Sequence, residues 1–417
     1  MSRPQPELAA ALAAITGSGY VIENPELRVD RFAPALLVEP TSAQEVVACL
    51  GVCSEMNAAV VPAGRATWLD GGNPLRRADV VLSLERMSRV VDYSPPDLTV
   101  TVEGGMPLRA FNEMVNRDRL WLPLDPPGAD AASVGAVVAC NSSGALRCGY
   151  GTPRDYVIGL KLAHADGRES KSGGRVVKNV AGYDLNKLYV GSFGTLAVIT
   201  EVTFKLRPLP EQCVTVALTA NHSERITELA QQVIATELQP VACVLSFANG
   251  TEKLLLRFAD NAAAVKSQVD ALRQARGDAS QITEVSGADE AALWAKINDL
   301  DGAAQAVLRI SVPLSKTVGV YEDLMGESNA AMIADLGSGI VRLAVSATDA
   351  LAAKIKQRRA AVEEVGGTLF IEKAPLEVRR QVDAWGEVGA SARLMKAVKE
   401  KFDPQSILNP GRFVAGI

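Results

Sequence analysis

The sequence has little that marks a metal, nucleic-acid or membrane protein. None of its six cysteines forms a C-x-x-C pair, so zinc and iron–sulfur ligation lack support and we predict no metal site. The net charge of -5 gives no reason to expect nucleic acid binding. No apolar run approaches the roughly 20 residues that a spanning helix needs, so we predict no direct membrane span.

The N-terminus also lacks the pattern of a signal peptide. Residues 1–20 are rich in alanine, but no basic region precedes a long apolar core. We therefore expect a cytoplasmic protein, and we leave open that a partner attaches it to a membrane.

Length and apolar periodicity predict two or three domains with ample core. A strand over 35–39, a helix from Thr41 and a strand over 59–61 form a β-α-β start, with Thr41 and Gln44 placed as a capping box. Cys49 and Cys53 share an apolar helix face with Val46, so both are expected to pack in the core. Further elements are predicted as strands at 80–84, 88–92 and 97–103 and a helix at 108–116.

The clearest strand alternates apolar and polar residues over 196–206. Pro208 and Pro210 follow it, and we place a domain boundary there. Beyond it, strands alternate with polar helices, which predicts an α+β domain whose sheet carries helices on one side. Its strands are predicted at 214–218, 242–247, 254–258, 306–312 and 340–345, and its helices at 223–237, 260–276, 287–298 and 349–365. Segment 277–304 is weakly patterned, and no internal repeat is evident.

Three glycine-containing segments are candidates for binding a dinucleotide, because glycine lets the backbone approach a large ligand. The turn over 62–67 follows a strand and offers backbone N–H groups to a diphosphate, although such turns are also common without a ligand. The stretch over 133–155 is rich in small residues and amides, with a long surface loop as the alternative. The third segment covers 178–195. No G-x-G-x-x-G follows the first strand, so a Rossmann domain is disfavoured.

Together these segments resemble the FAD-binding domain of the vanillyl-alcohol oxidase/PCMH superfamily. The run GGRVVKNVAGYDLNKLYVGSFGTLAVITEVTFKLRP over 173–208 closely resembles the FAD-binding E subunits of bacterial glycolate oxidases. The tail FDPQSILNPGRF over 402–413 fits the same family, and residues 308–313 resemble a segment of its cap domain. The resemblance is strong over roughly 60–210, patchy through the middle and clear again in the tail.

The resemblance implies an α+β fold: a two-subdomain PCMH-type FAD-binding domain over 1–208, an α+β cap or substrate domain over 209–400, and a segment over 401–417 that returns to the FAD domain. Superfamily members with covalent flavin carry a histidine in the first glycine loop, but this chain has Gly64-Arg65-Ala66 there. We therefore predict non-covalent FAD.

The resemblance also implies which residues bind FAD. Residues 62–67 would surround the diphosphate, 133–135 would contact the diphosphate and ribitol, and the glycines and Asp155 further on would line the flavin. The backbone of Ile199 would bond the adenine, and Asn409 would lie near the isoalloxazine. The full set is Pro62, Ala63, Gly64, Arg65, Ala66, Thr67, Ser133, Val134, Gly135, Ser143, Gly144, Gly149, Gly151, Asp155, Ile199 and Asn409.

The activity implied by the resemblance is oxidation of a 2-hydroxy acid, which needs a carboxylate clamp and a proton acceptor. Arg309 lies on a predicted cap strand and is our first choice of clamp, with Arg342 as the second. A salt bridge is the alternative for each. The base is missing: His164 ends a strand and is expected to pack, and His222 lies in a polar turn and is expected to be solvated.

Catalytic relatives typically carry histidines in the cap domain, and this chain has none after His222. Three hypotheses therefore stay open. The chain is an FAD-bearing subunit of a glycolate (2-hydroxy acid) oxidase complex, working with a homologous flavin subunit and an iron–sulfur subunit. Alternatively it is a non-catalytic FAD-loaded scaffold or electron relay in that complex, or a stand-alone D-lactate-type dehydrogenase.

Overall fold

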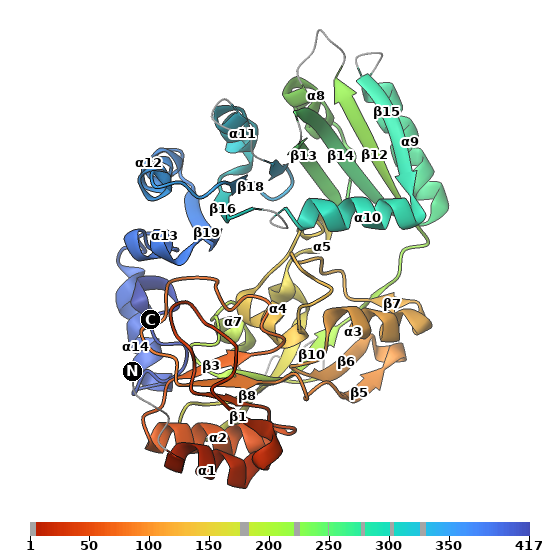
Figure 1. The fold of residues 1–417 in the computed structure, drawn as a ribbon. Helices are drawn as coiled ribbons and strands as arrows, with labels where there is room; N and C mark the ends of the chain where they lie inside the picture. Colours follow the sequence, from red (N-terminus) through yellow and green to blue (C-terminus); the bar gives the residue numbers. More distant parts are fainter. Residues whose placement is uncertain are drawn as a thin grey trace.

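The computed structural model describes residues 6–175, 183–220, 226–248, 250–276, 280–300, 304–325 and 331–417. The chain forms an N-terminal domain and a cap domain, drawn one above the other in Figure 1. The last long helix, α14 (Ser391–Phe402), lies beside the N-terminal domain. The chain thus returns to its first domain after forming the cap, and the predicted α+β fold class is confirmed.

The N-terminal domain starts with a four-stranded sheet of order β1-β2-β4-β3. Strands β2 and β3 both run parallel to β4, so the chain needs a crossover between them, which α2 supplies. Cys49 and Cys53 of α2 are buried in this core, as predicted. The elements are α1 (Pro6–Thr16), β1 (Val21–Glu23), β2 (Leu36–Val38), α2 (Ala43–Glu55), β3 (Val60–Ala63) and β4 (Val80–Ser83).

A second, antiparallel sheet of order β5-β6-β10-β8-β9 completes the N-terminal domain. Its central strand is β10, the strand with the clearest sequence pattern. Its strands are β5 (Val90–Ser94), β6 (Thr99–Glu103), β8 (Val157–Ala163), β9 (Glu169–Gly173) and β10 (Val198–Lys205), beside the small pair β7 (Leu120–Trp121) and β11 (Arg207–Pro208). Its helices are α3 (Leu108–Val115), α4 (Val134–Cys140), α5 (Arg147–Tyr150), α6 (Pro153–Tyr156) and α7 (Asn186–Tyr189).

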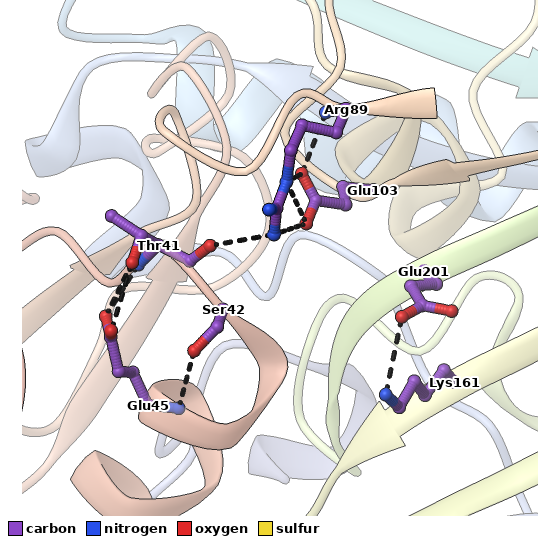
Figure 2. Close-up of polar contacts among 7 residues, drawn as sticks. All are labelled: Thr41, Ser42, Glu45, Arg89, Glu103, Lys161 and Glu201. Atoms are coloured by element: carbon purple, nitrogen blue, oxygen red, sulfur yellow. Dashed lines mark hydrogen bonds and ion pairs between the residues drawn. The ribbon is translucent and has the colours of Figure 1, made fainter. Parts of the chain in front are cut away.

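Polar contacts join the two sheets, and Figure 2 shows them. Arg89 pairs with the buried carboxylate of Glu103 on β6 at 2.8 Å. The same guanidinium donates to the carbonyl oxygen of Thr41, which precedes α2, at 3.3 Å. Within the second sheet, Lys161 of β8 pairs across the strands with Glu201 of β10 at 3.3 Å. The Arg89 contacts therefore fix the start of α2 against the second sheet.

The cap at the start of α2 lies one residue later than predicted. Ser42 has extended backbone angles, and its Oγ accepts from the N–H of Glu45 at 3.2 Å. The Glu45 carboxylate in turn accepts from the N–H of Thr41 at 2.7 Å. The predicted capping box of Thr41 and Gln44 is wrong, because the extended residue that precedes the helix is Ser42.

The cap domain is one antiparallel sheet of order β15-β12-β14-β13-β17-β18-β16-β19. Its two halves have the same β-α-β-β-α-β sequence of elements, and in each half the first strand lies between the third and the fourth. The halves join where β13 pairs with β17. The cap is thus an internal structural repeat, which the sequence did not reveal.

The first half comprises β12 (Gln212–Ala220), α8 (Ile226–Ile234), β13 (Ala242–Ala248), β14 (Thr251–Asp260), α9 (Ala262–Arg276) and β15 (Ser280–Ser286). Helix α10 (Gly287–Asn298) connects it to the second half. The second half comprises β16 (Ala306–Ser311), α11 (Thr317–Met325), β17 (Met332–Asp335), β18 (Ile340–Val345), α12 (Leu351–Glu364) and β19 (Thr368–Lys373), followed by α13 (Leu376–Gln381).

The two faces of the cap sheet have different roles. Helices α8, α9, α11 and α12 pack on one face around a single large core. On the other face, α10 packs through Trp294 and Ile297 against β13 and β14, together with Ala145 of the N-terminal domain. Helices on one side were predicted, and α10 is the exception. The rest of this second face turns toward the N-terminal domain.

The C-terminal segment is built into the N-terminal domain. Asn409 donates its N–H to the carbonyl of Val60 on β3 at 3.0 Å, which extends the first sheet. Lys399 of α14 is buried, donates to the Thr195 carbonyl at 2.8 Å and pairs with Asp403 at 2.6 Å. Helix α14 therefore packs with the tail on the N-terminal domain, although the sequence placed the start of the returning segment at 401.

Two segments are more regular than their sequence patterns predicted. The weakly patterned segment 277–304 contains the strand β15, which was not predicted, before the helix α10, which was predicted over 287–298. The stretch after Ser133, for which a surface loop was the alternative to a binding segment, contains α4 and α5, and α4 ends at Asn141 with a φ of 48°. In the described ranges no helix is long and apolar enough to cross a membrane. Those ranges also hold no group of three or more His, Cys, Asp and Glu side chains placed to bind a metal.

Candidate functional site

The first of two adjoining cavities lies in the N-terminal domain and collects most of the predicted cofactor residues. It is partly open to solvent. The turn after β3, the start of α4, the start of β10 and the C-terminal tail meet around it. The predicted residues that line it are Pro62, Ala63, Gly64, Ala66, Thr67, Ser133, Gly135, Ile199 and Asn409.

Close backbone approach holds these segments together. A Cβ on Gly64 would lie 2.8 Å from the Cβ of Ser133 and closer still to its Oγ. A Cβ on Gly135 would lie 2.6 Å from the carbonyl oxygen of Gly104, and one on Gly104 would overlap the carbonyl oxygen of Ile199. The glycines therefore let the four segments close around the cavity, which larger residues would force apart.

The turn after β3 fits a diphosphate. The backbone N–H groups of Gly64, Arg65, Ala66 and Thr67 donate to no group in the described ranges. Ala66 has a φ of 58°, which makes the turn concave. A run of free N–H groups in such a turn is an anion site, because phosphate oxygens accept hydrogen bonds and carry negative charge.

Asn409 provides a second sign that a ligand fills this cavity. Its Nδ2 donates to the carbonyl of Phe193 at 2.8 Å. Its Oδ1 is buried and has no hydrogen-bond partner in the part of the chain that the structure describes. An unpaired buried acceptor is costly, so a donor from a bound group fits there. The adenine and isoalloxazine rings of FAD carry such donors, and the cavity fits FAD.

The remaining predicted cofactor residues lie outside this cavity. Arg65 forms a surface pair with Glu85 at 2.9 Å. Val134 is buried in the core, and its N–H, like that of Gly135, already donates to a backbone carbonyl. Ser143 has a buried Oγ without a partner in the described ranges. The prediction that these residues touch FAD stays a prediction.

Three predicted glycines and Asp155 lie at turns near the cap. Gly144 donates its N–H to Asp125 at 3.0 Å. Gly149 packs against Val241 of the cap. Gly151 has a φ of 87° and precedes Thr152, whose N–H donates to Asp155 at 2.8 Å in the capping box of α6. None of the four lines either cavity. The glycine-rich block over 133–155 thus contributes to the contact between the two domains as well as to the cofactor cavity.

A second, open cavity of about 1470 Å³ lies between the N-terminal domain and the cap sheet. It adjoins the first cavity, because Thr67, Trp68, Gly71, Cys140 and Phe193 line both. On the cap side, the cavity is lined by side chains of β16, β18 and β19 that point away from the helices of the cap. A substrate bound here would lie next to a group held in the first cavity.

Both predicted clamps face this second cavity, but only one is available for a ligand. Arg309 and Arg342 are cross-strand neighbours on β16 and β18. Arg342 is buried and bonded at 2.8 Å both to Glu372 and to the carbonyl of Asn298. Arg309 lies 5.2 Å over the ring of Phe370, and its Nε is 3.8 Å from Glu372.

The Nε of Arg309 has no hydrogen-bond partner in the described ranges. Arg309 can therefore take an anion, whereas Arg342 is fixed in the structure and orients Glu372. The carboxylate of Glu372 lies close to both guanidinium groups and neutralises part of their positive charge.

An aromatic wall forms another side of the second cavity. Trp385 packs against Phe193, Phe370 and Phe413, with ring centroids 4.7, 4.4 and 4.8 Å apart. The four rings come from the N-terminal domain, the cap and the C-terminal segment. Sequence reasoning missed these residues, because their meeting depends on the path of the chain rather than on a local pattern.

His164 supplies no base in this cavity. His164 is buried at the end of β8, stacks on Phe402 and lies 2.6 Å from the Oγ of Ser170. Burial lowers the pKa of His164, and it packs as predicted. His222 lies outside the described residues, as do residues 178–182 of the third glycine segment. The carboxylates that line the cavity are Asp70 and Glu372.

Known proteins similar to this chain match both the domain and the fold. Residues 34–173 match a family model described as an FAD binding domain. Glycolate oxidase subunit GlcD of Bacillus subtilis is 28% identical, with 92% of this chain and 89% of that protein covered. Glycolate oxidase subunit GlcE of Escherichia coli is 28% identical over 78% of this chain and 85% of its own length.

A probable mitochondrial D-lactate dehydrogenase of Danio rerio is 29% identical, with 91% of this chain and 84% of that protein covered. Among solved structures, 4-ethylphenol oxidase from Gulosibacter chungangensis superposes with a TM-score of 0.74 at 15% identity, over 98% of this chain and 96% of that one. The fold is therefore of the PCMH type, FAD is the cofactor, and the chain is an FAD-dependent oxidoreductase. Because GlcD and GlcE are equally identical to it, these relatives do not single out the E subunit.

Proposed function

We propose that the chain is an FAD-bearing subunit of a glycolate-oxidase-type complex and oxidises a small 2-hydroxy acid at its CH–OH group. The observation that carries the proposal is the position of Arg309, which faces the second cavity with an Nε that makes no hydrogen bond in the described ranges. A guanidinium binds a carboxylate through two parallel hydrogen bonds. Arg309 would fix the acid group that all 2-hydroxy acids share.

The described side chains have distinct tasks in this reaction. The turn after β3 and Asn409 would hold FAD, which supplies the acceptor for the hydride that leaves C2 of the substrate. Arg309 would hold the carboxylate and so aim C2 at the junction of the two cavities, where Phe193 and Trp68 line both. The hydroxyl proton must pass to a base, and Glu372 beside Arg309 is the carboxylate we propose. The product is the 2-oxo acid.

We further propose a homologous flavin subunit and an iron–sulfur subunit as partners that take the electrons onward. Two relatives named as glycolate oxidase subunits, GlcD and GlcE, support an assembly of this kind. Co-expression of the chain with candidate subunits tests it. Copurification with a stoichiometric iron–sulfur protein supports the proposal, and a chain that purifies alone and passes electrons directly to a soluble acceptor opposes it.

The scaffold or relay role remains the second candidate, because His164, the histidine that the structure describes, does not line the second cavity. The stand-alone D-lactate-type dehydrogenase is a third, supported by the relative of that name. Anaerobic addition of glycolate or D-lactate to the isolated flavoprotein separates these roles. Bleaching of the flavin supports catalysis by this chain, a flavin that stays oxidised favours the relay or scaffold, and a chain without flavin removes the FAD assignment.

A further inference from the structure

The second cavity has more positive charge than one carboxylate requires. Four basic side chains line it, Arg147, Arg309, Arg342 and Lys373, against the two carboxylates Asp70 and Glu372. Arg342 already donates hydrogen bonds to Glu372 and to the Asn298 carbonyl. Arg309 is the proposed clamp for the substrate carboxylate. The proposed function assigns no binding partner to Arg147.

Arg147 comes from the N-terminal domain, at the start of α5 next to the cap (Figure 1). Its backbone is fixed by a hydrogen bond from its N–H to the Gly144 carbonyl. Its side chain lines the cavity, and its guanidinium has no hydrogen bond or ion pair in the described ranges. A half-buried guanidinium without a partner is unfavourable, and a bound anion would satisfy it.

The surrounding charges agree with this geometry. Burial lowers the pKa of Arg147, and the nearby Arg309 lowers it further, while Asp335, Asp155 and Asp125 raise it. These carboxylates are engaged elsewhere: Asp125 accepts from two backbone N–H groups and from Asn298. Asp335 accepts from Ser338 and Gly337, and Asp155 caps α6. They moderate the positive charge without filling the hydrogen-bonding positions of Arg147.

Two guanidinium groups from two domains thus face one cavity, one from the cap and one from the N-terminal domain. Given the proposed function, on which this inference rests, we propose that the substrate is a 2-hydroxy acid with a second carboxylate. Arg309 binds the carboxylate next to the hydroxyl, and Arg147 binds the distal one.

The test compares a diacid with its neutral isostere. Flavin reduction in the anaerobic holoprotein is followed with D-2-hydroxyglutarate and with the same acid whose distal carboxylate is a primary amide. We expect the diacid to reduce the flavin with about 10- to 100-fold higher efficiency, the worth of a charged hydrogen-bonded contact. Arg147→Gln should bring the ratio close to one, and Arg147→Lys should restore part of it.

Arg154→Gln is the matched control, because Arg154 lies a few residues further on, is exposed and lines neither cavity. It should keep the wild-type ratio. Equal efficiency of diacid and amide in the wild type would overturn the inference. So would an Arg147→Gln variant that weakens both substrates equally, since that result means both arginines bind one carboxylate.

A binding measurement keeps this result separate from the proposed function. Glutarate lacks the hydroxyl and cannot be oxidised, so its binding, followed through the visible spectrum of the bound flavin, is compared with that of its monoamide. Tighter binding of glutarate that depends on Arg147 supports the anion site even if no 2-hydroxy acid reduces the flavin, in which case the proposed function alone fails. Equal binding of the two compounds contradicts the anion site.

Discussion

The contact between Gly64 and Ser133 gives the sharpest prediction about the cofactor cavity. A Cβ on Gly64 would lie 2.8 Å from the Ser133 Cβ and would overlap its Oγ, while the next neighbour, the Ala136 Cβ, is 3.9 Å away. Gly64→Ala must therefore push the turn after β3 away from α4. Overpacking of this kind costs about 1–3 kcal/mol, and we expect FAD affinity to fall by about 5- to 150-fold.

The clash has one partner, so it should be reversible. In a Ser133→Gly background the close contacts of the new methyl group with the Ser133 side chain are gone, and the next atom, the Ala136 Cβ, lies at an ordinary contact distance of 3.9 Å. The same Gly64→Ala change should then cost no more than about 0.5 kcal/mol, as is usual for a substitution that meets no clash. Ser133→Gly by itself removes the hydroxyl cap of α4, which is expected to cost a few tenths of a kcal/mol.

The assay is a double-mutant cycle on FAD binding. Apoprotein of the wild type, both single variants and the double variant is titrated with FAD, and thermal unfolding of each apoprotein shows whether the fold survives. A coupling of about 1–3 kcal/mol between positions 64 and 133 supports the cavity described above. Unchanged FAD affinity in Gly64→Ala, or additive effects in the double variant, would refute the reasoning.

Three further predictions concern charges. Arg309→Ala should lower the efficiency of flavin reduction about 10- to 100-fold with little loss of stability, whereas Arg342→Ala should lower the free energy of unfolding by about 3–5 kcal/mol. Stopped-flow reduction and urea unfolding measure the two effects, and a large loss of stability in Arg309→Ala with little loss in Arg342→Ala would contradict these roles. Asp30 lies buried between two guanidinium groups at 2.7 and 3.2 Å, so Asp30→Ala should cost about 3–5 kcal/mol in urea unfolding, and a loss below about 1 kcal/mol would contradict a buried ion cluster. Burial, the largest cause, raises the pKa of Asp335 to about 6, so its contribution to stability is full below about pH 4 and is lost as the pH rises through 6. The free energy of unfolding of the wild type, relative to that of Asp335→Asn, should therefore rise by up to about 3 kcal/mol on going from pH 7 to 4. A difference between the two proteins that does not change with pH would contradict the raised pKa.

The cofactor half of the site was predictable from sequence because its signals are local. Gly64 lies in the turn after β3, Ser133 and Gly135 lie at the start of α4, and the resemblance assigned them a common ligand. The structure brings these turns around one cavity. What sequence alone could not give is the contact that holds them, the approach of Gly64 to Ser133 across many intervening residues.

The cap was harder to predict, since its order arises from pairing between distant strands. Strand β17 is short and buried on both faces, so it shows no alternation, and the repeat of the two halves is visible in topology rather than in residue pattern. Arg309 and Arg342 were found because single arginines interrupt apolar strands. Their different roles depend on Glu372 and Asn298, which no local pattern connects to them.

Arg147 and the aromatic wall were missed for a related reason. Arg147 lies in the glycine-rich block, where the small residues drew the interpretation toward the cofactor, and its side chain reaches the second cavity through the short helix α5. Phe193, Phe370 and Trp385 come from three separate parts of the chain.

The rate of anaerobic flavin reduction in the isolated chain tests the central claim most directly. The claim is that this chain itself oxidises a 2-hydroxy acid held by Arg309. We predict that a 2-hydroxy acid bleaches the bound FAD with saturable kinetics, and that Arg309→Ala slows the reaction at low substrate concentration while the flavin stays bound. A bound flavin that remains oxidised with every 2-hydroxy acid, or an Arg309→Ala variant that is reduced as fast as the wild type, would contradict it.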